Sequence, residues 1–294
     1  MIAKIIDGEL VAKKFKEIIK KRVVDLKEGG VSPTLATVLV GDDPGSQKYV
    51  KMKERDCQQV GISSLSHNLQ KEISETELIQ LINKLNLKKD VHGILVQLPL
   101  PKHIDEQKII YTISPDKDVD GLHPYNMGKL MRGEYSFESS LLPCTPKGIM
   151  ELLAYYKIRI EGKHAVVVGR SVLVGGPMSK MLLDKNATVT VCHSRTVGIG
   201  EYTKQADILI SAVGRPPEIY GETGFKITKS MVKKGAVVIG TGVGYLGKNS
   251  FFDIDFNEVK ETASYLTPKF GSVGPMTRAM LLKNTIIATQ NLRM

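Results

Sequence analysis

The chain has 294 residues, of which 42% are hydrophobic and 24% are charged, and its formal net charge is +10 at pH 7. This length predicts two domains with substantial cores, and the composition excludes a disordered or low-complexity protein. No apolar run reaches the roughly 18 residues that a membrane helix needs. Asp7 and Gly8 come too early for the apolar region of a secretory signal, so we expect a cytosolic protein with no membrane partner.

The cysteines and the net charge indicate the cellular compartment and the kind of partner to expect. Cys57, Cys144 and Cys192 are far apart and odd in number, which fits neither a disulfide framework nor a zinc site and agrees with a reducing compartment. The lysines are spread over amphipathic segments, Trp is absent and aromatic residues are only 6% of the chain. We therefore expect no nucleic-acid partner, and a positive surface would instead attract an anionic cofactor or substrate tail.

The first half of the chain alternates helical and strand-like patterns. Apolar spacing predicts helices over residues 9–26, 49–60, 75–85 and 107–112, and strands over 35–40, 62–69 and 93–98. This alternation is typical of an α/β fold with a mostly parallel sheet and helices on both sides. From Pro115 to Pro146 turn residues dominate, and we place the domain boundary at the end of this stretch.

The second half predicts a doubly wound parallel sheet of the Rossmann type. Strands are predicted over residues 164–169, 188–192, 207–212 and 236–239, with helices over 147–156 and through 181–183. A strand, a glycine turn, a helix and a second strand form the mononucleotide-binding unit of such folds. A last helix over 275–292 is expected to fold back onto the first domain. The predicted domains are 1–142 with 275–294, and 143–274.

The turn after Val168 is the candidate phosphate site, because it would aim backbone N–H groups and a helix N-terminus at a phosphate. It reads Gly169-Arg170-Ser171, so a serine replaces the second glycine of the usual G-x-G-x-x-G pattern, and the next glycine is Gly175. The second strand is followed by Ser194 and Arg195 with no acid to bind the ribose hydroxyls of NAD. The two arginines and Ser194 would bind the extra phosphate of NADP, which we therefore expect as the cofactor.

A second constellation of polar residues lies in the first half. Tyr49 and Lys53 are four residues apart, so their side chains share one face of a helix. Gln97 ends a strand-like run and Asp120 lies in a predicted turn. An aromatic ring, an amine, an amide and a carboxylate suit a flat, polar, nitrogen-rich substrate. The alternative interpretation is that Lys53 is one of many surface lysines.

Two further patterns resemble ligand loops but do not complete them. Residues 116–121 begin like a calcium loop, but Met127 stands where a bidentate glutamate is required, so no metal is expected. Residues 240–244 read Gly-Thr-Gly-Val-Gly, but no helical pattern follows them. We expect this segment to let the backbone approach a ligand that is bound at the first glycine turn.

Six blocks, in order along the whole chain, closely resemble the bifunctional methylenetetrahydrofolate dehydrogenase/methenyltetrahydrofolate cyclohydrolase family. They are residues 49–53 (Tyr-Val-Lys-Met-Lys), 93–101 (Gly-Ile-Leu-Val-Gln-Leu-Pro-Leu-Pro), 115–121 (Pro-Asp-Lys-Asp-Val-Asp-Gly), 143–146 (Pro-Cys-Thr-Pro), 169–171 (Gly-Arg-Ser) and 273–277 (Val-Gly-Pro-Met-Thr). The resemblance implies two domains flanking a cleft, NADP on the C-terminal domain, a folate in the cleft and a homodimer. It also implies an enzyme of one-carbon metabolism that oxidises methylenetetrahydrofolate and then hydrolyses the methenyl product to formyl-tetrahydrofolate.

The resemblance also implies residue roles. Lys53 would be the main acid/base group of the cyclohydrolase step, with Gln97 hydrogen-bonded to it, Tyr49 packed on the folate rings and Asp120 holding the pterin nitrogens. It further places Leu98, Pro99 and Pro275 at the substrate, and Gly169, Arg170, Ser171, Ser194, Arg195 and Val243 at the cofactor. The chemistry agrees, because a lysine that activates water must be partly neutral, and desolvation beside a cationic methenyl group would lower its pKa.

The chain departs from the family pattern in three places. Val172 and Gly176 stand where the family usually has an Asn-like residue and a basic residue. Residues 240–244 replace Asp-Val-Gly-Ile-Asn, and residues 268–275 replace Pro-Val-Pro-Gly-Gly-Val-Gly-Pro. These changes lie around the expected nicotinamide half of the cofactor site. They keep open a second hypothesis, a cyclohydrolase with weak or NAD-dependent dehydrogenase activity, and a third, a non-catalytic nucleotide-binding regulator.

Overall fold

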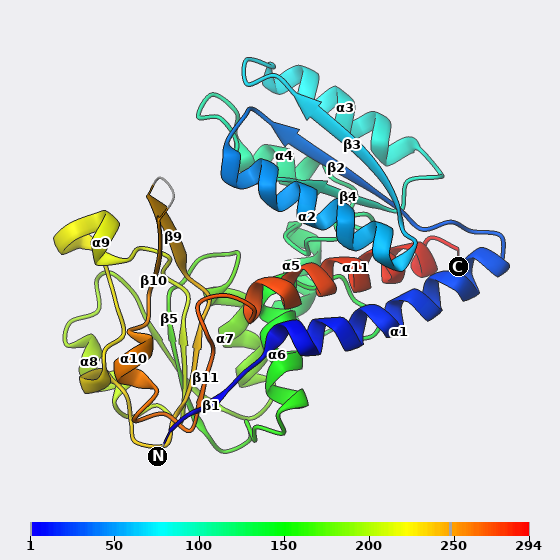
Figure 1. Cartoon of the computed structure of the whole chain (residues 1–294). Helices are drawn as coiled ribbons and strands as arrows, with labels where there is room; N and C mark the ends of the chain where they lie inside the picture. Colours follow the sequence, from blue (N-terminus) through cyan, green and yellow to red (C-terminus); the bar gives the residue numbers. More distant parts are fainter. Residues whose placement is uncertain (1, 247–248, 294) are drawn as a thin grey trace. The chain divides into compact units, whose positions relative to one another are not determined.

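The structure, a computed structural model, describes residues 2–246 and 249–293 and divides into two compact units. The α2 unit comprises Ala12–Cys144 and Arg278–Met294, and the β5 unit comprises Met1–Val11 and Thr145–Thr277. Each unit has its own parallel sheet (Figure 1). Within the described residues, no helix combines the length and the apolar character needed to cross a membrane.

The α2 unit is built on three parallel strands in the order β3-β2-β4. These are β2 (Thr34–Val40), β3 (Ser63–Leu69) and β4 (Gly93–Val96). The helices that lie wholly within this unit are α2 (Pro44–Val60), α3 (Glu75–Leu87), α4 (Glu106–Thr112) and α5 (Pro124–Arg132). Alternate residues of β2, Ala36, Val38 and Val40, share a buried cluster with Leu78 of α3 and Ile109 of α4. Because side chains alternate across a strand, the other face of β2 is left for α2.

The ends of α2 show why the sequence starts and stops it there. The Asp43 side chain accepts a hydrogen bond from the Ser46 backbone N–H at 2.7 Å, and Pro44 occupies the first turn, where its missing N–H costs nothing. Gly61 ends the helix with a left-handed φ of 84°. α2 carries Tyr49 and Lys53 of the candidate site, so the caps at its two ends fix the helix on which these side chains lie.

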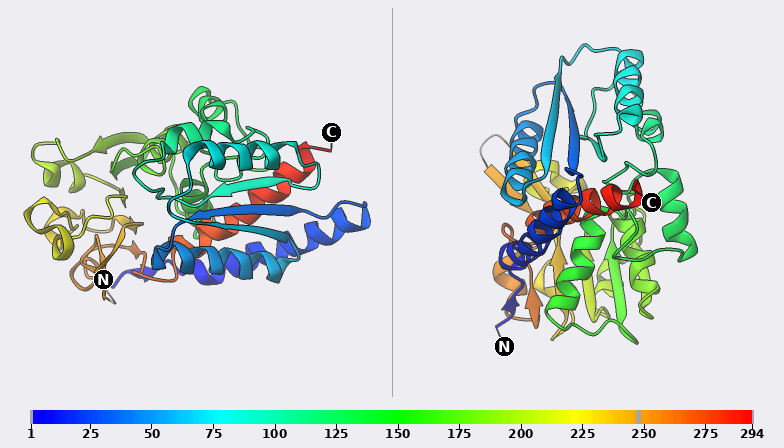
Figure 2. Two further views of the ribbon diagram at one scale, coloured as in Figure 1. Left: turned by 90° about the horizontal axis from the view of Figure 1, so that it is seen from above. Right: turned by 90° about the vertical axis from the view of Figure 1, so that its right-hand side faces the viewer.

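Three long helices have residues in both units: α1 (Gly8–Glu28), α6 (Cys144–Tyr155) and α11 (Val273–Asn291). The part of α11 from residue 278 onward packs within the α2 unit. The Asn284 side chain donates to the carbonyl oxygens of Val119 and Leu142, each at 2.8 Å, and the Arg293 side chain donates to Gly29 at 2.7 Å. Figure 2 shows α11 running beside α1. The prediction that the last helix returns to the first domain is confirmed.

The β5 unit contains a six-stranded, wholly parallel sheet in the order β1-β11-β8-β7-β5-β6. Its strands are β1 (Lys4–Ile5), β5 (His164–Val168), β6 (Thr188–Cys192), β7 (Ile208–Ser211), β8 (Val237–Gly240) and β11 (Tyr265–Leu266). Its short helices are α7 (Gly175–Leu183), α8 (Ile199–Thr203), α9 (Pro217–Tyr220) and α10 (Phe256–Val259), with 3-10 turns at Gly221–Thr223 and Lys229–Met231. The expected Rossmann-like parallel sheet is confirmed.

Several elements differ from the predictions. The sequence analysis treated residues 115–146 as irregular, but α5 lies inside that stretch, and α6 begins at Cys144. The outer strands β1 and β11 are only two residues each, so no periodicity could reveal them. A two-stranded antiparallel pair, β9 (Val243–Leu246) and β10 (Asn249–Phe252), follows β8 where no element was assigned.

Candidate functional site

One face of α2 carries a buried amine. Lys53 is only 6% exposed, and Tyr49, one turn earlier, places its ring 4.8 Å from the lysine Nζ. Asp56, three residues after Lys53, is also buried. Residues three and four apart are neighbours on a helix surface, so these three polar side chains form one group on the helix. Lys53 is therefore not an ordinary surface lysine.

Gln97 is the hydrogen-bond partner of that amine. β4 ends at Val96, and the Gln97 backbone N–H donates to the Val38 carbonyl at 2.8 Å, which holds the residue at the carboxyl end of the sheet. Its Oε1 accepts a hydrogen bond from Lys53 Nζ at 3.0 Å. Its Nε2 donates to the Leu98 carbonyl at 2.6 Å, which orients the amide. Leu98 is partly buried and Pro99, joined to it by a cis peptide bond, is exposed beside this contact.

Burial lowers the pKa of Lys53, because an ammonium group loses its hydration in the protein interior. The guanidinium of Arg278 lowers it further, and the carboxylate of Asp120 acts in the opposite direction. Burial also raises the pKa of the Tyr49 hydroxyl to about 12, so the phenol is neutral at physiological pH. Protonation of the Lys53 amine is therefore less favourable in this setting than in water.

Asp120 lies in a turn that a second carboxylate organises. The buried Asp118 side chain accepts hydrogen bonds from the backbone N–H groups of Leu122 at 3.2 Å and His123 at 2.8 Å, and from Asn126 Nδ2 at 2.9 Å. Asp120 itself is only partly buried, and its carboxylate accepts no hydrogen bond from the residues that the structure describes. A carboxylate that is held in place but not hydrogen-bonded can accept donors from a substrate.

The β5 unit brings the predicted cofactor residues to one edge of its sheet. Val168 of β5 and Cys192 of β6 are paired, so the Gly169-Arg170-Ser171 turn and the Ser194-Arg195 turn follow neighbouring strands. The side chains of all four non-glycine residues in these turns are exposed. Gly169 has a φ of 126°, and a Cβ there would lie 2.7 Å from the Ala212 carbonyl after β7. Strand order reverses beside β5, which is the position where doubly wound sheets bind ligands.

The N-terminus of α7 is open to an anion. Val174 is its N-cap and makes no side-chain capping hydrogen bond. The Gly176 backbone N–H donates to the Ser171 carbonyl at 3.0 Å and Pro177 has no N–H, so in this first turn Gly175 offers the backbone donor that no described residue uses and that a phosphate could accept from. Ser171 shapes this approach, because its hydroxyl accepts a hydrogen bond from the Val174 backbone N–H at 3.2 Å.

The glycine segment after β8 packs mainly on the protein itself. A Cβ at Gly242 would lie 2.4 Å from the Asp253 carboxylate and 2.4 Å from the Gly214 nitrogen. Val243 is partly buried and packs against the hydrophobic core of the unit. Glycine is needed at position 242 for this close packing, whether or not the backbone also approaches a ligand. Pro275, the remaining predicted substrate residue, is buried in the first turn of α11.

Sequence reasoning missed the charged residues that lie near the Lys53 amine. Arg278 of α11 donates through Nε to Asp56 Oδ2 at 2.6 Å, and Lys16 of α1 forms an ion pair with the other carboxylate oxygen. Asp56 could have been noticed, because it lies at helical spacing from Lys53. Arg278 directly follows the 273–277 block, but nothing local indicates which helix it contacts.

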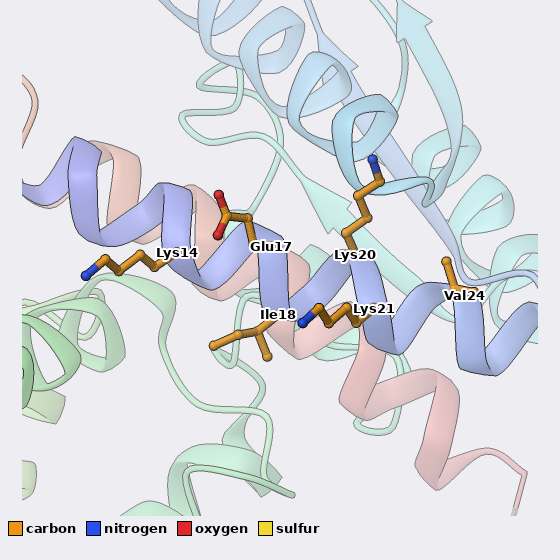
Figure 3. A pocket seen from close by; sticks show the side chains of 6 residues that line it. All are labelled: Lys14, Glu17, Ile18, Lys20, Lys21 and Val24. Atoms are coloured by element: carbon orange, nitrogen blue, oxygen red, sulfur yellow. The ribbon is translucent and has the colours of Figure 1, made fainter.

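A hollow of about 680 Å³ lies along the exposed side of α1 (Figure 3). Its lining includes none of the predicted site residues and consists of Lys14, Glu17, Ile18, Lys20, Lys21 and Val24. Four of these six side chains are charged, which is typical of a solvated helix face. In the part of the chain that the structure describes, no three His, Cys, Asp or Glu side chains cluster closely enough to hold a metal ion.

These features define an α/β protein with a Rossmann-like nucleotide-binding unit and a second unit that holds a buried amine between an amide and an aromatic ring. Residues 6–120 match the model of the tetrahydrofolate dehydrogenase/cyclohydrolase catalytic domain, and residues 143–293 match that of the NAD(P)-binding domain of the same family. The chain therefore belongs to the tetrahydrofolate dehydrogenase/cyclohydrolase family.

Individual relatives agree over the full length. The bifunctional protein FolD of Thermodesulfovibrio yellowstonii is 49% identical over 99% of this chain and 98% of its own length. The crystal structure of the bifunctional FolD enzyme from Campylobacter jejuni is 46% identical, with a TM-score of 0.92 over 99% of this chain and 100% of that one. A Trypanosoma brucei FolD structure, described as a complex with NADP cofactor and an inhibitor, is 34% identical, with a TM-score of 0.91 over 99% and 98% of the two chains.

Proposed function

We propose that this protein oxidises 5,10-methylenetetrahydrofolate with NADP and hydrolyses the resulting 5,10-methenyltetrahydrofolate to 10-formyltetrahydrofolate. The observation that carries the proposal is the Lys53 amine, which is buried, hydrogen-bonded to Gln97 at 3.0 Å and set beside the Tyr49 ring. It occurs in a chain whose two halves match both domains of a family that performs these reactions.

We assign folate binding and hydrolysis to the α2 unit, and NADP binding to the β5 unit, with domain boundaries near residues 143 and 275. Tyr49 would pack on the folate ring system, while Asp120 would accept hydrogen bonds from the amino and ring nitrogens of the pterin. Leu98 and Pro99 would line the substrate. The unused acceptor oxygens of Asp120 and the exposed Pro99 beside Gln97 support this assignment.

In the hydrolysis, Lys53 would act as the general base. Water forms a bond to the methenyl carbon, and the neutral amine accepts a proton from that water. The new hydroxyl then loses its proton and becomes the formyl C=O as the bond from this carbon to the ring nitrogen N5 breaks. N5 takes up a proton, and the formyl group remains on N10. Overall, one water is consumed and one proton is released. Gln97 would hold the amine toward the reacting carbon, because its Oε1 accepts one of the amine hydrogens.

The residues after β5 and β6 suit NADP. The uncapped N-terminus of α7 would receive the pyrophosphate, while Ser171 stabilises the turn before it. Arg170, Ser194 and Arg195 are exposed at neighbouring strand ends and would bind the phosphate on the ribose. Val243 would border the nicotinamide half. When bound, NADP supplies a hydride acceptor, and the protein contributes mainly alignment.

The direct test is an absorbance assay with methylenetetrahydrofolate and each nicotinamide nucleotide, followed by decay of the methenyl product. We expect reduction of NADP to exceed that of NAD, and Lys53→Met to abolish methenyl hydrolysis. Lys51→Met is the matched control, because Lys51 is exposed on the same helix. Normal hydrolysis by the Lys53 variant would refute the role assigned to this residue.

The altered segments 240–244 and 268–275 support one narrower candidate function, a cyclohydrolase with weak or NAD-dependent dehydrogenase activity. Slow reduction of NADP, or faster reduction of NAD, together with normal methenyl decay would favour it. The presence of Lys53, Gln97 and Asp120 argues against a non-catalytic regulator, because such a protein would not need all three.

We also propose that the protein acts as a cytosolic homodimer. The three cysteines are buried, and none is in a disulfide, which fits a reducing compartment.

The edge of the β5-unit sheet is the proposed dimer contact. β6 pairs with β5 on one side and, among the described strands, with none on the other. Leu183 and Val191 are exposed near that edge, at 56% and 41%. Sedimentation should give twice the mass of the chain, and Val191→Lys should weaken the dimer.

A further inference from the structure

A cluster of three charges, of which Arg278 and Asp56 are buried and Lys16 is partly exposed, lies one helical turn from Lys53. Arg278 and Asp56 are 8% and 5% exposed, and the Arg278 Nε donates to Asp56 Oδ2 at 2.6 Å. Lys16, from α1, binds the other oxygen of the same carboxylate. The cluster therefore holds two cations against one anion, and its net charge is positive. Burying the Arg278–Asp56 pair is costly, so its presence beside the site calls for an explanation.

Helical spacing places the residue that binds Arg278 next to Lys53. Asp56 follows Lys53 by three residues, which makes the two side chains neighbours on α2. Arg278 uses Nε for Asp56, and its two terminal amino groups have no hydrogen-bond partner among the residues that the structure describes. Its guanidinium is thus held at one atom by Asp56, which lies within one helical turn of Lys53.

We propose that Arg278 is a positioning residue of the hydrolysis reaction: held by Asp56, its guanidinium keeps the Lys53 amine uncharged and ready to accept a proton from water. This inference rests on the role proposed above for Lys53. The reason is electrostatic, because a second positive charge beside a fixed cation in a poorly solvated site is unfavourable.

Other groups also act on the charge of Lys53. They are the Tyr49 ring and the Cys57 thiol on α2, the Gln97 amide after β4, the Asp120 carboxylate and the Cys144 thiol at the start of α6. Asp120 stabilises the charged ammonium, whereas Arg278 and burial oppose it. Arg278 is the cation in this set, so its removal should shift the balance toward ammonium.

The competing explanation is that the ion pair only ties α11 to α2. Stability measurements do not distinguish the two, because losing the pair destabilises the fold under either explanation. A pH–rate profile does distinguish them, since a purely structural tie would leave the titration of Lys53 unchanged.

The experiment compares the pH dependence of methenyltetrahydrofolate hydrolysis in the wild type, Arg278→Met, Arg278→Lys and Lys16→Met. In Arg278→Met the acid limb of the profile should move to higher pH by roughly half a unit or more. Arg278→Lys keeps the charge and should retain the wild-type limb. Lys16→Met removes a cation from the same carboxylate and should also leave the limb in place. An unmoved limb in Arg278→Met, or an equal shift in Lys16→Met, would overturn the proposal.

Two further comparisons keep the outcome decisive. If Arg278→Met does not fold, Arg278→Gln, which can still donate to Asp56, should show the same shift. If neither uncharged variant folds while Arg278→Lys does, Arg278 is structural and the proposal fails. A wild type that does not hydrolyse the substrate, or a Lys53→Met variant that does, contradicts the proposed function instead, so the two failures are separable.

Discussion

Lys53 and Lys117 are both 6% exposed, and burial lowers the pKa of each, yet they do different things. Lys117 donates to the carbonyl oxygens of Leu85, Asn86 and Lys88 at 3.3, 2.8 and 2.7 Å. Its three ammonium hydrogens are therefore all used, and they cap the C-terminus of α3.

Lys53 makes a single hydrogen bond to the described residues, the one to Gln97. Two of its three possible donors are unused in a site that lacks full hydration. Burial alone therefore does not identify a functional lysine. What distinguishes the candidate catalytic group is hydrogen-bonding capacity that the fold leaves unfilled.

The largest expected effect is the loss of hydrolysis in Lys53→Met, by roughly 10²–10⁴-fold, because a general base is removed. Its unfolding free energy should stay the same or rise, since a poorly solvated amine is replaced by an apolar chain of similar length. Urea unfolding and methenyl decay on the same preparation provide the measurement. A Lys53→Met variant that loses both stability and activity would contradict the view that Lys53, unlike Lys117, does not stabilise the fold.

Lys117→Met should show the reverse pattern. The Asn86 carbonyl loses its donor, while the carbonyls of Leu85 and Lys88 still accept from the backbone N–H groups of Lys88 and Val91 at 3.3 Å. We therefore expect the unfolding free energy to fall by about 1 to 3 kcal/mol. The rate of methenyl hydrolysis per folded molecule should remain close to that of the wild type. Hydrogen exchange at the end of α3 would show whether the loss is local to this helix.

Asp253 is a buried carboxylate with one oxygen that accepts no hydrogen bond from the described residues. Its Oδ2 accepts a hydrogen bond from the Ser211 hydroxyl at 2.6 Å, while its buried Oδ1 has no hydrogen-bond partner among the described residues. Burial raises its pKa from 3.8 to about 6, so the folded state binds this proton more tightly than the unfolded chain. The contribution to stability is therefore full below pH 3.8 and is lost as the pH rises to about 6.

Asp253→Asn should remove that part of the pH dependence, which amounts to roughly 2 to 3 kcal/mol between the two limits. The measurement is the difference in unfolding free energy between wild type and variant at several pH values from 4 to 7. A constant difference across this range would mean that Asp253 does not titrate there.

The smallest effect is expected at the other end of α3. Ser74 accepts a hydrogen bond from the Glu77 backbone N–H at 3.2 Å, and Glu77 accepts one from the Ser74 backbone N–H at 3.0 Å. Ser74→Ala should cost about 1 kcal/mol in thermal unfolding. If Ser74→Ala cost as much as Lys117→Met, the distinction between an exposed and a buried cap would be wrong.

Much of the fold could be predicted because local sequence patterns determine many of its helices and strands. The helices α1, α2 and α3 have one apolar side, and the strands β2, β5 and β6 are short apolar runs next to turn residues. The strands β1 and β11 could not be predicted, because two residues form a strand only when a neighbouring strand pairs with them. α5 was missed because its His123 and Gly133 caps and its Pro124 are residues typical of turns.

The candidate site divides in the same way. Helical spacing placed Tyr49 beside Lys53, and the order of strands and turns predicted where a phosphate would bind. The Lys53–Gln97 hydrogen bond joins residues 44 apart, and the Arg278–Asp56 pair joins residues 222 apart. No local pattern encodes such contacts.

By itself, then, the sequence determined the alternating α/β architecture, the glycine turn after β5 and the side-chain types of the site, since each depends on neighbours along the chain. Only the tertiary structure decided that Lys53 is buried with one hydrogen bond while Lys117 is fully satisfied, and that Arg278 lies against Asp56. The reason is that solvation and electrostatic environment depend on which distant segments pack around a group.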